Sequence, residues 1–95
     1  MAMMIAATVP AMAGGAPDGA AIFKANCAIC HGADGRKVNK VMKIQDLTSP
    51  AVQEKSDEEL AGVTANGKGK MPGFKSRLSA DEIAAVVAHI RALAE

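Results

Sequence analysis

The chain contains no tryptophan or tyrosine, and its only aromatic residues are Phe23 and Phe74. An apolar core must therefore come from aliphatic side chains and methionine, packed around some larger object. Charge excess is also missing, because 11 basic and 10 acidic residues leave a formal net charge of +1. This balance argues against a sequence-wide basic surface for nucleic acid. No stretch alternates apolar and polar residues long enough to predict a strand, so the expected fold class is all-α.

A chain of 95 residues predicts a single small domain, which we place at residues 18–95. Domains of this size bury a limited share of their surface and often need a metal, a cofactor or a disulfide. The segment 1–17 is neutral and largely apolar, and it is expected to lie outside that domain.

Residues 11–13 read Ala-Met-Ala before a glycine, which is typical of the end of a secretory signal. This pattern predicts cleavage after Ala13 and export to the periplasm. No lysine or arginine precedes the apolar run, so an ordinary structural arm is the alternative. A stable membrane span is not expected, because roughly 20 apolar residues are needed and prolines and glycines interrupt this segment.

Two helices are predicted at the ends of the domain. The first runs from about Asp18 to Cys30, with Ile22 and Phe23 on one side. The last begins at a capping box in which Ser79 caps and Glu82 closes. We expect Phe23 to contact the 87–90 region of the last helix. The apolar stripe of that helix contains Ile83, Val86, Val87, Ile90 and either Leu93 or Ala94.

A middle helix is predicted from the capping box of Ser56 and Glu59 to a stop at Gly67, with Leu60 and Val63 facing inward. Before it, Ser49 and Pro50 read as a cap and first helical residue of a short turn. The stretch 37–43 is basic and only weakly helical in pattern.

The sequence Cys27-Ala28-Ile29-Cys30-His31 holds the only two cysteines of the chain. Two thiols and an imidazole at this spacing can add across both vinyl groups of a haem while the histidine binds its iron. The covalent links hold His31 beneath the iron as its proximal ligand. A thioredoxin-type disulfide would need a βαβ context and a zinc knuckle a second ligand pair, and the sequence offers neither. The motif predicts one covalently attached haem c.

The second axial position needs another ligand, and beyond residue 17 the only methionines are Met42 and Met71. Met71 stands in the loop 67–73, between two predicted helices, from which a side chain can reach inward. A thioether is a weak, neutral ligand that favours ferrous iron. We expect His31 and Met71 as the axial pair, which leaves no open position for a substrate. Met42 is the reserve ligand, and a role for Met71 in filling the core is the alternative.

The order of a helix ending in CAICHG, a capped middle helix, the loop GKGKMPGF and a terminal helix DEIAAVVAHIRALA resembles a class I monohaem cytochrome c of the small bacterial type. The resemblance covers the chain from residue 18 onward. It implies a small cytochrome c fold of three to four helices around the haem, and electron transfer as the activity. It also implies thioether bonds from Cys27 and Cys30 and axial ligation by His31 and Met71.

Some features depart from the family pattern. Phe23 matches the aromatic residue of the terminal helix pair, but His89 stands where members commonly have another aromatic residue. Many members have a proline after the haem-binding turn whose carbonyl oxygen accepts from the ring N–H of the proximal histidine. Pro50 lies too far along this chain to take that role, so the acceptor for the ring N–H of His31 is not identified. The usual tryptophan and tyrosine donors to the haem propionates are absent as well. The remaining candidates are backbone N–H groups, Lys43, Gln45 and Arg77.

The expected function is one-electron transfer between periplasmic or membrane redox proteins, without enzymatic activity. Docking is expected to be brief, and Lys68, Lys70 and Lys75 are candidate contacts for an acidic partner, with a merely solvated loop as the alternative. Two other functions stay open: a haem subunit of a larger oxidoreductase, or a peroxidase-like or gas-binding protein in which Met71 is labile. We expect a monomer, with a dimer by helix exchange as the alternative.

Overall fold

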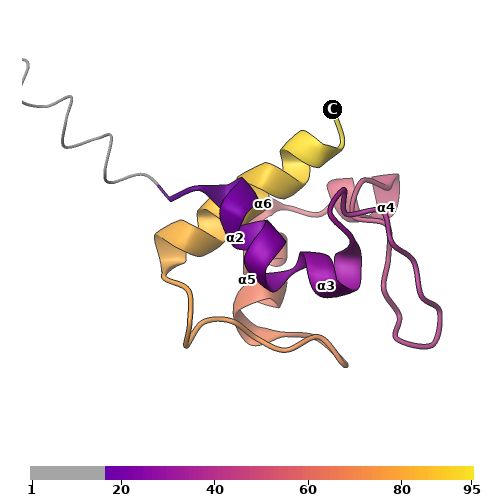
Figure 1. Ribbon diagram of the computed structural model, residues 1–95, viewed down its shortest axis with the longest axis horizontal. Coiled ribbons are helices and arrows are strands. Elements are labelled where there is room, and N and C mark those ends of the chain that lie inside the picture. The colour runs from indigo at the N-terminus through magenta and orange to yellow at the C-terminus, as the bar shows by residue number, and fades with distance from the viewer. Residues whose placement is uncertain (1–16) are drawn as a thin grey trace, which may run out of the picture.

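The computed structural model describes residues 17–95, and the regular structure within them is helical. Figure 1 shows these helices packed together without a sheet. The prediction of an all-α fold is therefore confirmed for the described residues. Within residues 17–95 three helices are longer than a single turn, in agreement with the small number expected. The helices are α2 (Gly19–Asn26), α3 (Ala28–His31), α4 (Pro50–Gln53), α5 (Asp57–Asn66) and α6 (Ala80–Leu93).

The predictions for the segment 1–17 fall outside the described residues, except at Pro17. The signal sequence, the cleavage after Ala13 and the boundary of the domain therefore stay predictions. Within residues 17–95, no helix combines the length and the apolar character that crossing a membrane requires.

The first predicted helix, over 18–30, is divided at Cys27 into α2 and α3. The side-chain amide of Asn26 donates a hydrogen bond to the carbonyl oxygen of Ile22 at 2.9 Å. Such local side-chain bonds compete with a continuing helix. The carbonyl oxygen of Cys27 then accepts from the backbone N–H of His31 at 2.9 Å, which starts the new turn. The division makes α3 a separate turn that ends at His31.

Both predicted capping boxes are present. The backbone N–H of Glu59 donates to the hydroxyl of Ser56 at 3.1 Å, and the N–H of Glu82 donates to Ser79 at the same distance. The two glutamate carboxylates accept from the backbone N–H groups of the capping serines in return. Gly67 ends α5 with a φ of 82°, a left-handed value that favours glycine. These ends are fixed by residues no more than a few positions away, which is why the sequence predicts them.

The short turn predicted after Ser49 is α4, and Pro50 is its first residue. The side chain of Ser49 makes no capping hydrogen bond, so the cap is correct in position but not in chemistry.

The stretch 37–43 does not form a helix, although its pattern is weakly helical. Asn39 and Ile44 exchange two backbone hydrogen bonds, at 3.1 and 2.8 Å, and close a turn between them. The side chain of Asn39 also accepts from the backbone N–H of Met42 at 3.0 Å, and this local bond competes with helix formation. Lys43 has a φ of 59°, which ends any helical path.

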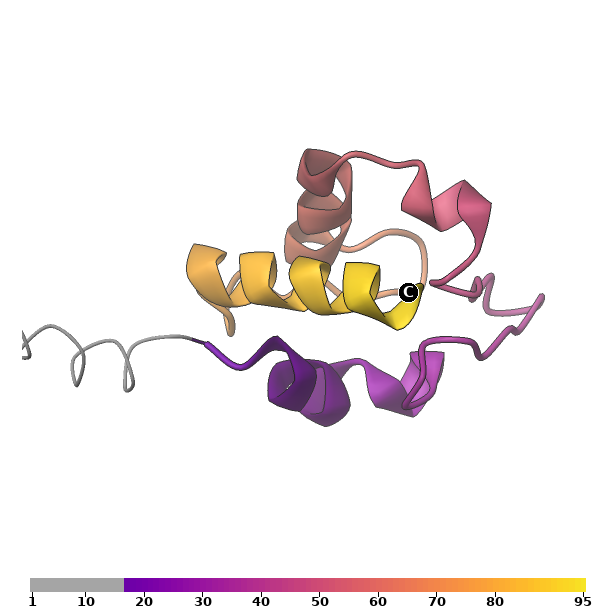
Figure 2. The same ribbon diagram turned by 90° about the horizontal axis from the view of Figure 1, so that it is seen from above.

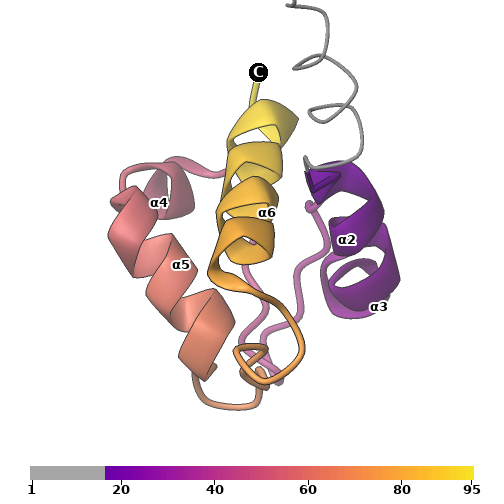
Figure 3. The same ribbon diagram turned by 90° about the vertical axis from the view of Figure 1, so that its left-hand side faces the viewer.

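The buried core lies on both sides of α6. Figures 2 and 3 show α2 and α3 along one side of α6 and α4 and α5 along the other. Phe23 is 1 % exposed and packs with Cys27, Val86 and Ile90. The predicted contact between Phe23 and the last helix is therefore present, through Val86 and Ile90. The second cluster contains Val52, Leu60 and Val87, so Val87 faces the other side.

The residue Leu93, which is partly buried against the first cluster, continues the apolar stripe of α6, whereas Ala94 is exposed. The apolar stripe predicted for α6 thus faces the core. Of the two residues of α5 predicted to face inward, Leu60 is buried in the core and Val63 is only half-buried.

The crossing of α2 and α6 depends on Gly19, which the sequence analysis did not single out. A Cβ atom at this position would overlap the carbonyl oxygen of Ala85 and lie 3.3 Å from Cβ of His89. The ring of His89 lies 5.1 Å from that of Phe23 with an interplanar angle of 54°. His89 therefore occupies an aromatic position in the helix pair, as its half-buried side chain indicates.

Arg91 joins the end of α6 to the link between α4 and α5. Its guanidinium donates two hydrogen bonds to Asp57, at 3.1 and 2.8 Å. It also donates to the carbonyl oxygens of Gln53 and Lys55, at 2.9 and 2.6 Å. The Gln53 side chain donates to the carbonyl oxygen of Leu47 at 2.7 Å. This network holds the segments on the α5 side against α6.

Candidate functional site

The single turn α3 gathers three of the four predicted site residues. Cys27 stands at its N-terminal end, and Cys30 and His31 are its last two residues. The carbonyl oxygen of Cys27 accepts from the backbone N–H groups of both Cys30 and His31, at 3.2 and 2.9 Å. Cys27 is buried in the core, Cys30 is exposed, and His31 is half-buried. Two thiols and one imidazole therefore lie on one turn at the surface of the core.

Burial affects the ionisation of two of these groups. It raises the pKa of the Cys27 thiol, and a negative charge on Cys30 would raise it further. Burial also lowers the pKa of the His31 imidazole. At neutral pH the imidazole is thus held in its neutral form, which is the form that binds a metal.

The Nδ1 atom of His31 is buried and has no hydrogen-bond partner among residues 17–95. Such atoms are rare in folded proteins, and they often mark a functional group. When one ring nitrogen of a histidine binds a metal, the other normally donates to an acceptor that fixes the ring. The described residues supply no acceptor at Nδ1, in line with the absence of the family's proline. This unpaired atom is the unusual feature of the α3 turn.

Met71 comes from the loop that follows α5, and two glycines let this loop fold tightly. A Cβ atom at Gly67 would lie 2.5 Å from the carbonyl oxygen of Met71. A Cβ atom at Gly73 would lie 2.6 Å from the carbonyl oxygen of Ala65. Lys68 and Met71 exchange two backbone hydrogen bonds, at 3.1 and 2.9 Å. Met71 is therefore held in a closed turn against the end of α5, with its side chain half-buried.

The residues after Met71 are tied back to α5. The backbone N–H of Phe74 donates to the carbonyl oxygen of Thr64 at 2.9 Å. Thr64 is the buried polar residue of the core, and its hydroxyl donates to the carbonyl oxygen of Leu60 at 2.8 Å. Phe74 is 5 % exposed, and the Arg77 guanidinium lies 4.7 Å from the centre of its ring. Sequence reasoning missed these anchors, and the backbone bond between Phe74 and Thr64 joins residues ten positions apart.

Figure 1 shows the Met71 loop below α3 and Figure 3 shows it below α6, at the lower edge of the molecule in both views. The site residues therefore come from two elements, a turn on one side of α6 and a loop at the end of α5. The donor set fits a covalent haem, because two thiols and a neutral imidazole share one turn and a thioether stands on a separate loop that backbone hydrogen bonds close. Met42 lies on the other loop and is 39 % exposed.

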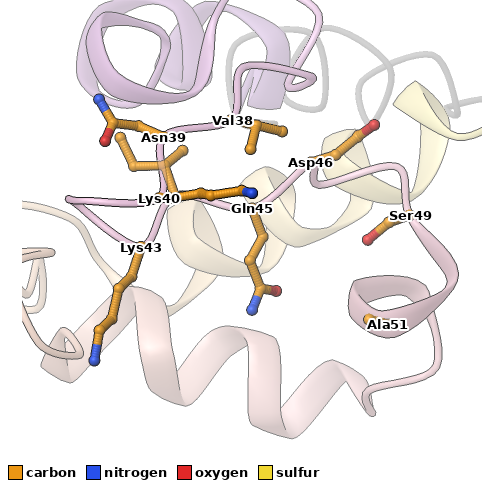
Figure 4. Close-up of a pocket in the computed structure, with 9 residues that line it drawn as sticks. Val38, Asn39, Lys40, Lys43, Gln45, Asp46, Ser49 and Ala51 are labelled. Atoms are coloured by element: carbon orange, nitrogen blue, oxygen red, sulfur yellow. The ribbon is translucent and has the colours of Figure 1, made fainter.

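A hollow of about 500 Å³ lies between the turn 39–44 and α4. Figure 4 shows Lys40 and Gln45 along its wall and Ser49 beyond them. Lys43 and Gln45, two of the candidate propionate donors, both line this hollow. Arg77, the third candidate, lies over Phe74 instead. The structure thus separates the three candidates into two places.

This helical fold, with two thiols and an imidazole on one turn, defines the class of covalent haem proteins. A family model described as cytochrome c oxidase, cbb3-type, subunit III matches residues 14–90. A cytochrome c6 of Leptolyngbya boryana is 36 % identical over 81 % of this chain and 91 % of its own length. A cytochrome c6 of Microcystis aeruginosa is 42 % identical over 82 % of this chain and 96 % of its own.

The structure is similar to that of a solved c-type cytochrome, KustC0563, with a TM-score of 0.74 and 26 % sequence identity. The similarity covers 82 % of this chain and 99 % of the solved one. The chain therefore belongs to the class I monohaem cytochrome c family. It is an electron carrier with one covalently bound haem c, as the sequence predicted.

Proposed function

We propose that Cys27 and Cys30 would hold the haem of this carrier through thioether bonds, and that His31 and Met71 would supply the two side-chain ligands of its iron. The observation that supports this assignment best is the α3 turn, which presents both thiols and a neutral, half-buried imidazole with an unpaired Nδ1. When bound, the haem supplies an iron that gains and loses one electron. The remaining chemistry belongs to the side chains of the chain.

Each residue has a defined role in this proposal. The thiols of Cys27 and Cys30 each add across a vinyl group, which fixes the α3 turn relative to the ring plane. His31 stays neutral because its burial disfavours the protonated ring, so its nitrogen is available at neutral pH. Met71 contributes a weak, uncharged thioether that favours the ferrous state and raises the reduction potential.

The proposal makes the protein a carrier rather than an enzyme, because His31 and Met71 together would leave the iron no open position for a substrate. The closed turn of the Met71 loop supports it, since backbone hydrogen bonds on both sides of Met71 hold the loop against α5. A labile methionine would be expected in a loop with few such anchors. A peroxidase-like or gas-binding function is therefore the weaker alternative.

The test is the absorption spectrum of the haem-loaded protein, with Met71→Ala and the matched control Met42→Ala. We expect a low-spin ferrous spectrum that carbon monoxide does not change in the natural chain and in Met42→Ala. Met71→Ala is expected to become high-spin in the ferric state, to bind carbon monoxide and to have a lower reduction potential. A natural chain that binds carbon monoxide readily would contradict the axial role of Met71.

The finer cellular role belongs to the same proposal. We infer that the chain is exported to the periplasm, on the signal-like pattern before Gly14, and that it works as a monomer. Its partners are an electron donor and an electron acceptor that dock briefly over a small area. Mass spectrometry of protein recovered from periplasmic extracts would show the cleavage site and one haem adduct.

A second candidate function is a haem subunit of a larger oxidoreductase, because the matching family model takes its description from an oxidase subunit. The coverage of 91 % and 96 % of the two cytochrome c6 chains favours the separate carrier. Size-exclusion chromatography of the protein from its native membrane and periplasmic fractions separates the two. A carrier elutes at its own mass from the periplasm, whereas a subunit elutes with an oxidase.

A further inference from the structure

The last residue of α5, Asn66, is followed directly by Gly67. Asparagine is a chemically labile residue, because the backbone nitrogen of the next residue can attack its side-chain amide carbon and close a succinimide ring. Glycine in the second position favours this attack, since it has no side chain to obstruct the ring. The side chain of Asn66 is exposed to solvent. Sequence and exposure therefore both favour reaction at this residue.

The other two asparagines of the chain provide an internal comparison. The amide of Asn26 is half-buried and donates to the carbonyl oxygen of Ile22 at 2.9 Å. The side-chain oxygen of Asn39 accepts from the backbone N–H of Met42 at 3.0 Å. Neither residue is followed by glycine. Among residues 17–95, Asn66 is thus the asparagine that combines a glycine neighbour with a side chain outside any hydrogen bond.

The peptide bond between Asn66 and Gly67 is packed against the Met71 loop. A Cβ atom at Gly73 would lie 2.7 Å from the carbonyl carbon of Asn66 and 2.9 Å from its oxygen. A Cβ atom at Gly67 would lie 2.5 Å from the carbonyl oxygen of Met71. Figure 3 shows the lower end of α5 continuing directly into this loop. An atom added to the main chain at this peptide bond must therefore displace the loop from α5.

The folded structure keeps the attacking nitrogen occupied. The backbone N–H of Gly67 donates to the carbonyl oxygen of Val63 at 2.7 Å, and this hydrogen bond closes the last turn of α5. Attack on the side chain of Asn66 needs this nitrogen without its proton, so the turn must open first. Helix ends open more readily than helix centres. The rate of attack therefore depends on how firmly the Met71 loop holds the end of α5.

We propose that Asn66 is a site of spontaneous deamidation, and that closure of the Met71 loop on α5 controls its rate. The nitrogen of Gly67 forms a bond to the side-chain amide carbon of Asn66. The bond from that carbon to the amide nitrogen breaks, and ammonia leaves with the proton that Gly67 has lost. Water then opens the succinimide at either of its carbonyl carbons and gives aspartate or isoaspartate.

The consequence of the reaction follows from the packing of this peptide bond. Isoaspartate routes the main chain through the former side chain and so inserts one methylene between α5 and the Met71 loop. The backbone atoms of Gly67 and Met71 are already in close contact there, so the loop no longer fits against α5. The modification itself is independent of what Met71 binds, whereas its effect on the iron rests on the proposed ligation by Met71.

The first test is incubation of the haem-loaded natural chain at mildly alkaline pH, followed by peptide mapping with mass spectrometry. Methylation by a protein isoaspartyl methyltransferase counts isoaspartate separately. We expect Asn66 to be converted while Asn26 and Asn39 stay intact. An unmodified Asn66, or faster conversion of Asn39, would overturn the assignment of the site.

Gly73→Ala tests the control by the loop, because its methyl group would press on the carbonyl group of Asn66. We expect Asn66 to deamidate roughly tenfold faster in this variant, since a loop that opens more often frees the Gly67 nitrogen more often. Gly69→Ala is the matched control, since no atom lies within 4 Å of its added Cβ, and its rate should stay within about twofold of the natural rate. Mild denaturant opens the same turn without a substitution and should also speed the reaction. A constant rate under both treatments would overturn the control by the loop.

The absorption spectrum separates this proposal from the ligand assignment. As isoaspartate accumulates, we expect a high-spin ferric fraction to grow in the natural chain but not in Asn66→Gln, whose longer side chain closes its ring more slowly. An unchanged spectrum after full conversion would overturn the effect on the loop if Met71→Ala itself is high-spin. If Met71→Ala is low-spin as well, the ligand assignment fails, while the modification mapped at Asn66 stands.

Discussion

The helix pair α2–α6 and the Met71 loop reach order by different means. The helix pair is held by buried apolar contacts, with Phe23 and Val86 each 1 % exposed at its centre. The Met71 loop has little apolar burial apart from Phe74, and backbone hydrogen bonds and glycines hold it instead. The helix pair thus stabilises the fold, whereas the loop positions Met71, the predicted second ligand of the iron. We therefore expect changes in the helix pair to lower the free energy of unfolding, and changes in the loop to alter the ligation of the iron as well.

The largest effect is expected at Gly19→Ala in the helix pair. The added methyl group overlaps the backbone of Ala85, which cannot move without moving α6. We expect the free energy of unfolding to fall by about 3 kcal/mol in denaturant titrations of the haem-loaded protein. Gly62→Ala is the control, since no atom lies within 4 Å of the added Cβ. That control should be stabilised by about 0.5–1 kcal/mol, and equal effects in both variants would contradict the tight crossing.

The next effect is expected at Gly73→Ala in the Met71 loop. Its Cβ would lie 2.6 Å from the carbonyl oxygen of Ala65, so the loop must move away from α5. We expect a loss of about 2 kcal/mol and, more tellingly, a high-spin fraction in the ferric absorption spectrum. Gly69→Ala adds no contact, and its φ of 58° costs only about 1 kcal/mol. A low-spin spectrum in Gly73→Ala would show that the loop does not set the ligand.

A smaller effect is expected at Arg91→Gln, which lies at the end of α6 and is bonded to the link between α4 and α5 rather than to the Met71 loop. The change removes hydrogen bonds to the carbonyl oxygens of Gln53 and Lys55 as well as the ion pair with Asp57. We expect a loss of about 1–2 kcal/mol by chemical denaturation with an unchanged haem spectrum. Asp57→Asn should cost no more than about 0.5 kcal/mol, because the Asp57 side chain is 74 % exposed. Similar losses in both variants would assign the effect to the ion pair.

The smallest effect concerns the pKa of Asp46, which follows the basic stretch 37–43. The hydroxyl and then the backbone N–H of Thr48 donate to this carboxylate, which lowers its pKa below the usual value of about 3.9. The unfolded chain therefore binds this proton more tightly than the folded one. The stabilisation is present above about pH 3.9 and is lost as the pH falls through the lowered value. Carboxyl NMR titration should show a higher pKa in Thr48→Val, and an unchanged pKa would contradict this cause.

Prediction from the sequence succeeded where partners are near in the chain. The capping boxes of Ser56 with Glu59 and of Ser79 with Glu82 span three residues each, and both helices begin where the sequence places them. The cysteines and the histidine of α3 share a five-residue motif for the same reason. The family, the fold class and the covalent haem follow from such local patterns.

Prediction failed where distant residues decide the outcome. The approach of Gly19 to Ala85 and the contacts of Arg91 join residues more than 30 positions apart, and composition gives no sign of either. The division of the first helix at Cys27 is a local feature that the sequence analysis also missed, and the side-chain amide of Asn26 donates to the carbonyl oxygen of Ile22 beside it.

X-ray absorption at the iron edge of the haem-loaded protein tests the central claim most directly, because it counts the sulfur atoms bound to the metal. We expect one sulfur ligand in the natural chain and in Met42→Ala, and none in Met71→Ala. A natural chain with nitrogen ligands alone, or a sulfur ligand that persists in Met71→Ala, would contradict the proposed site.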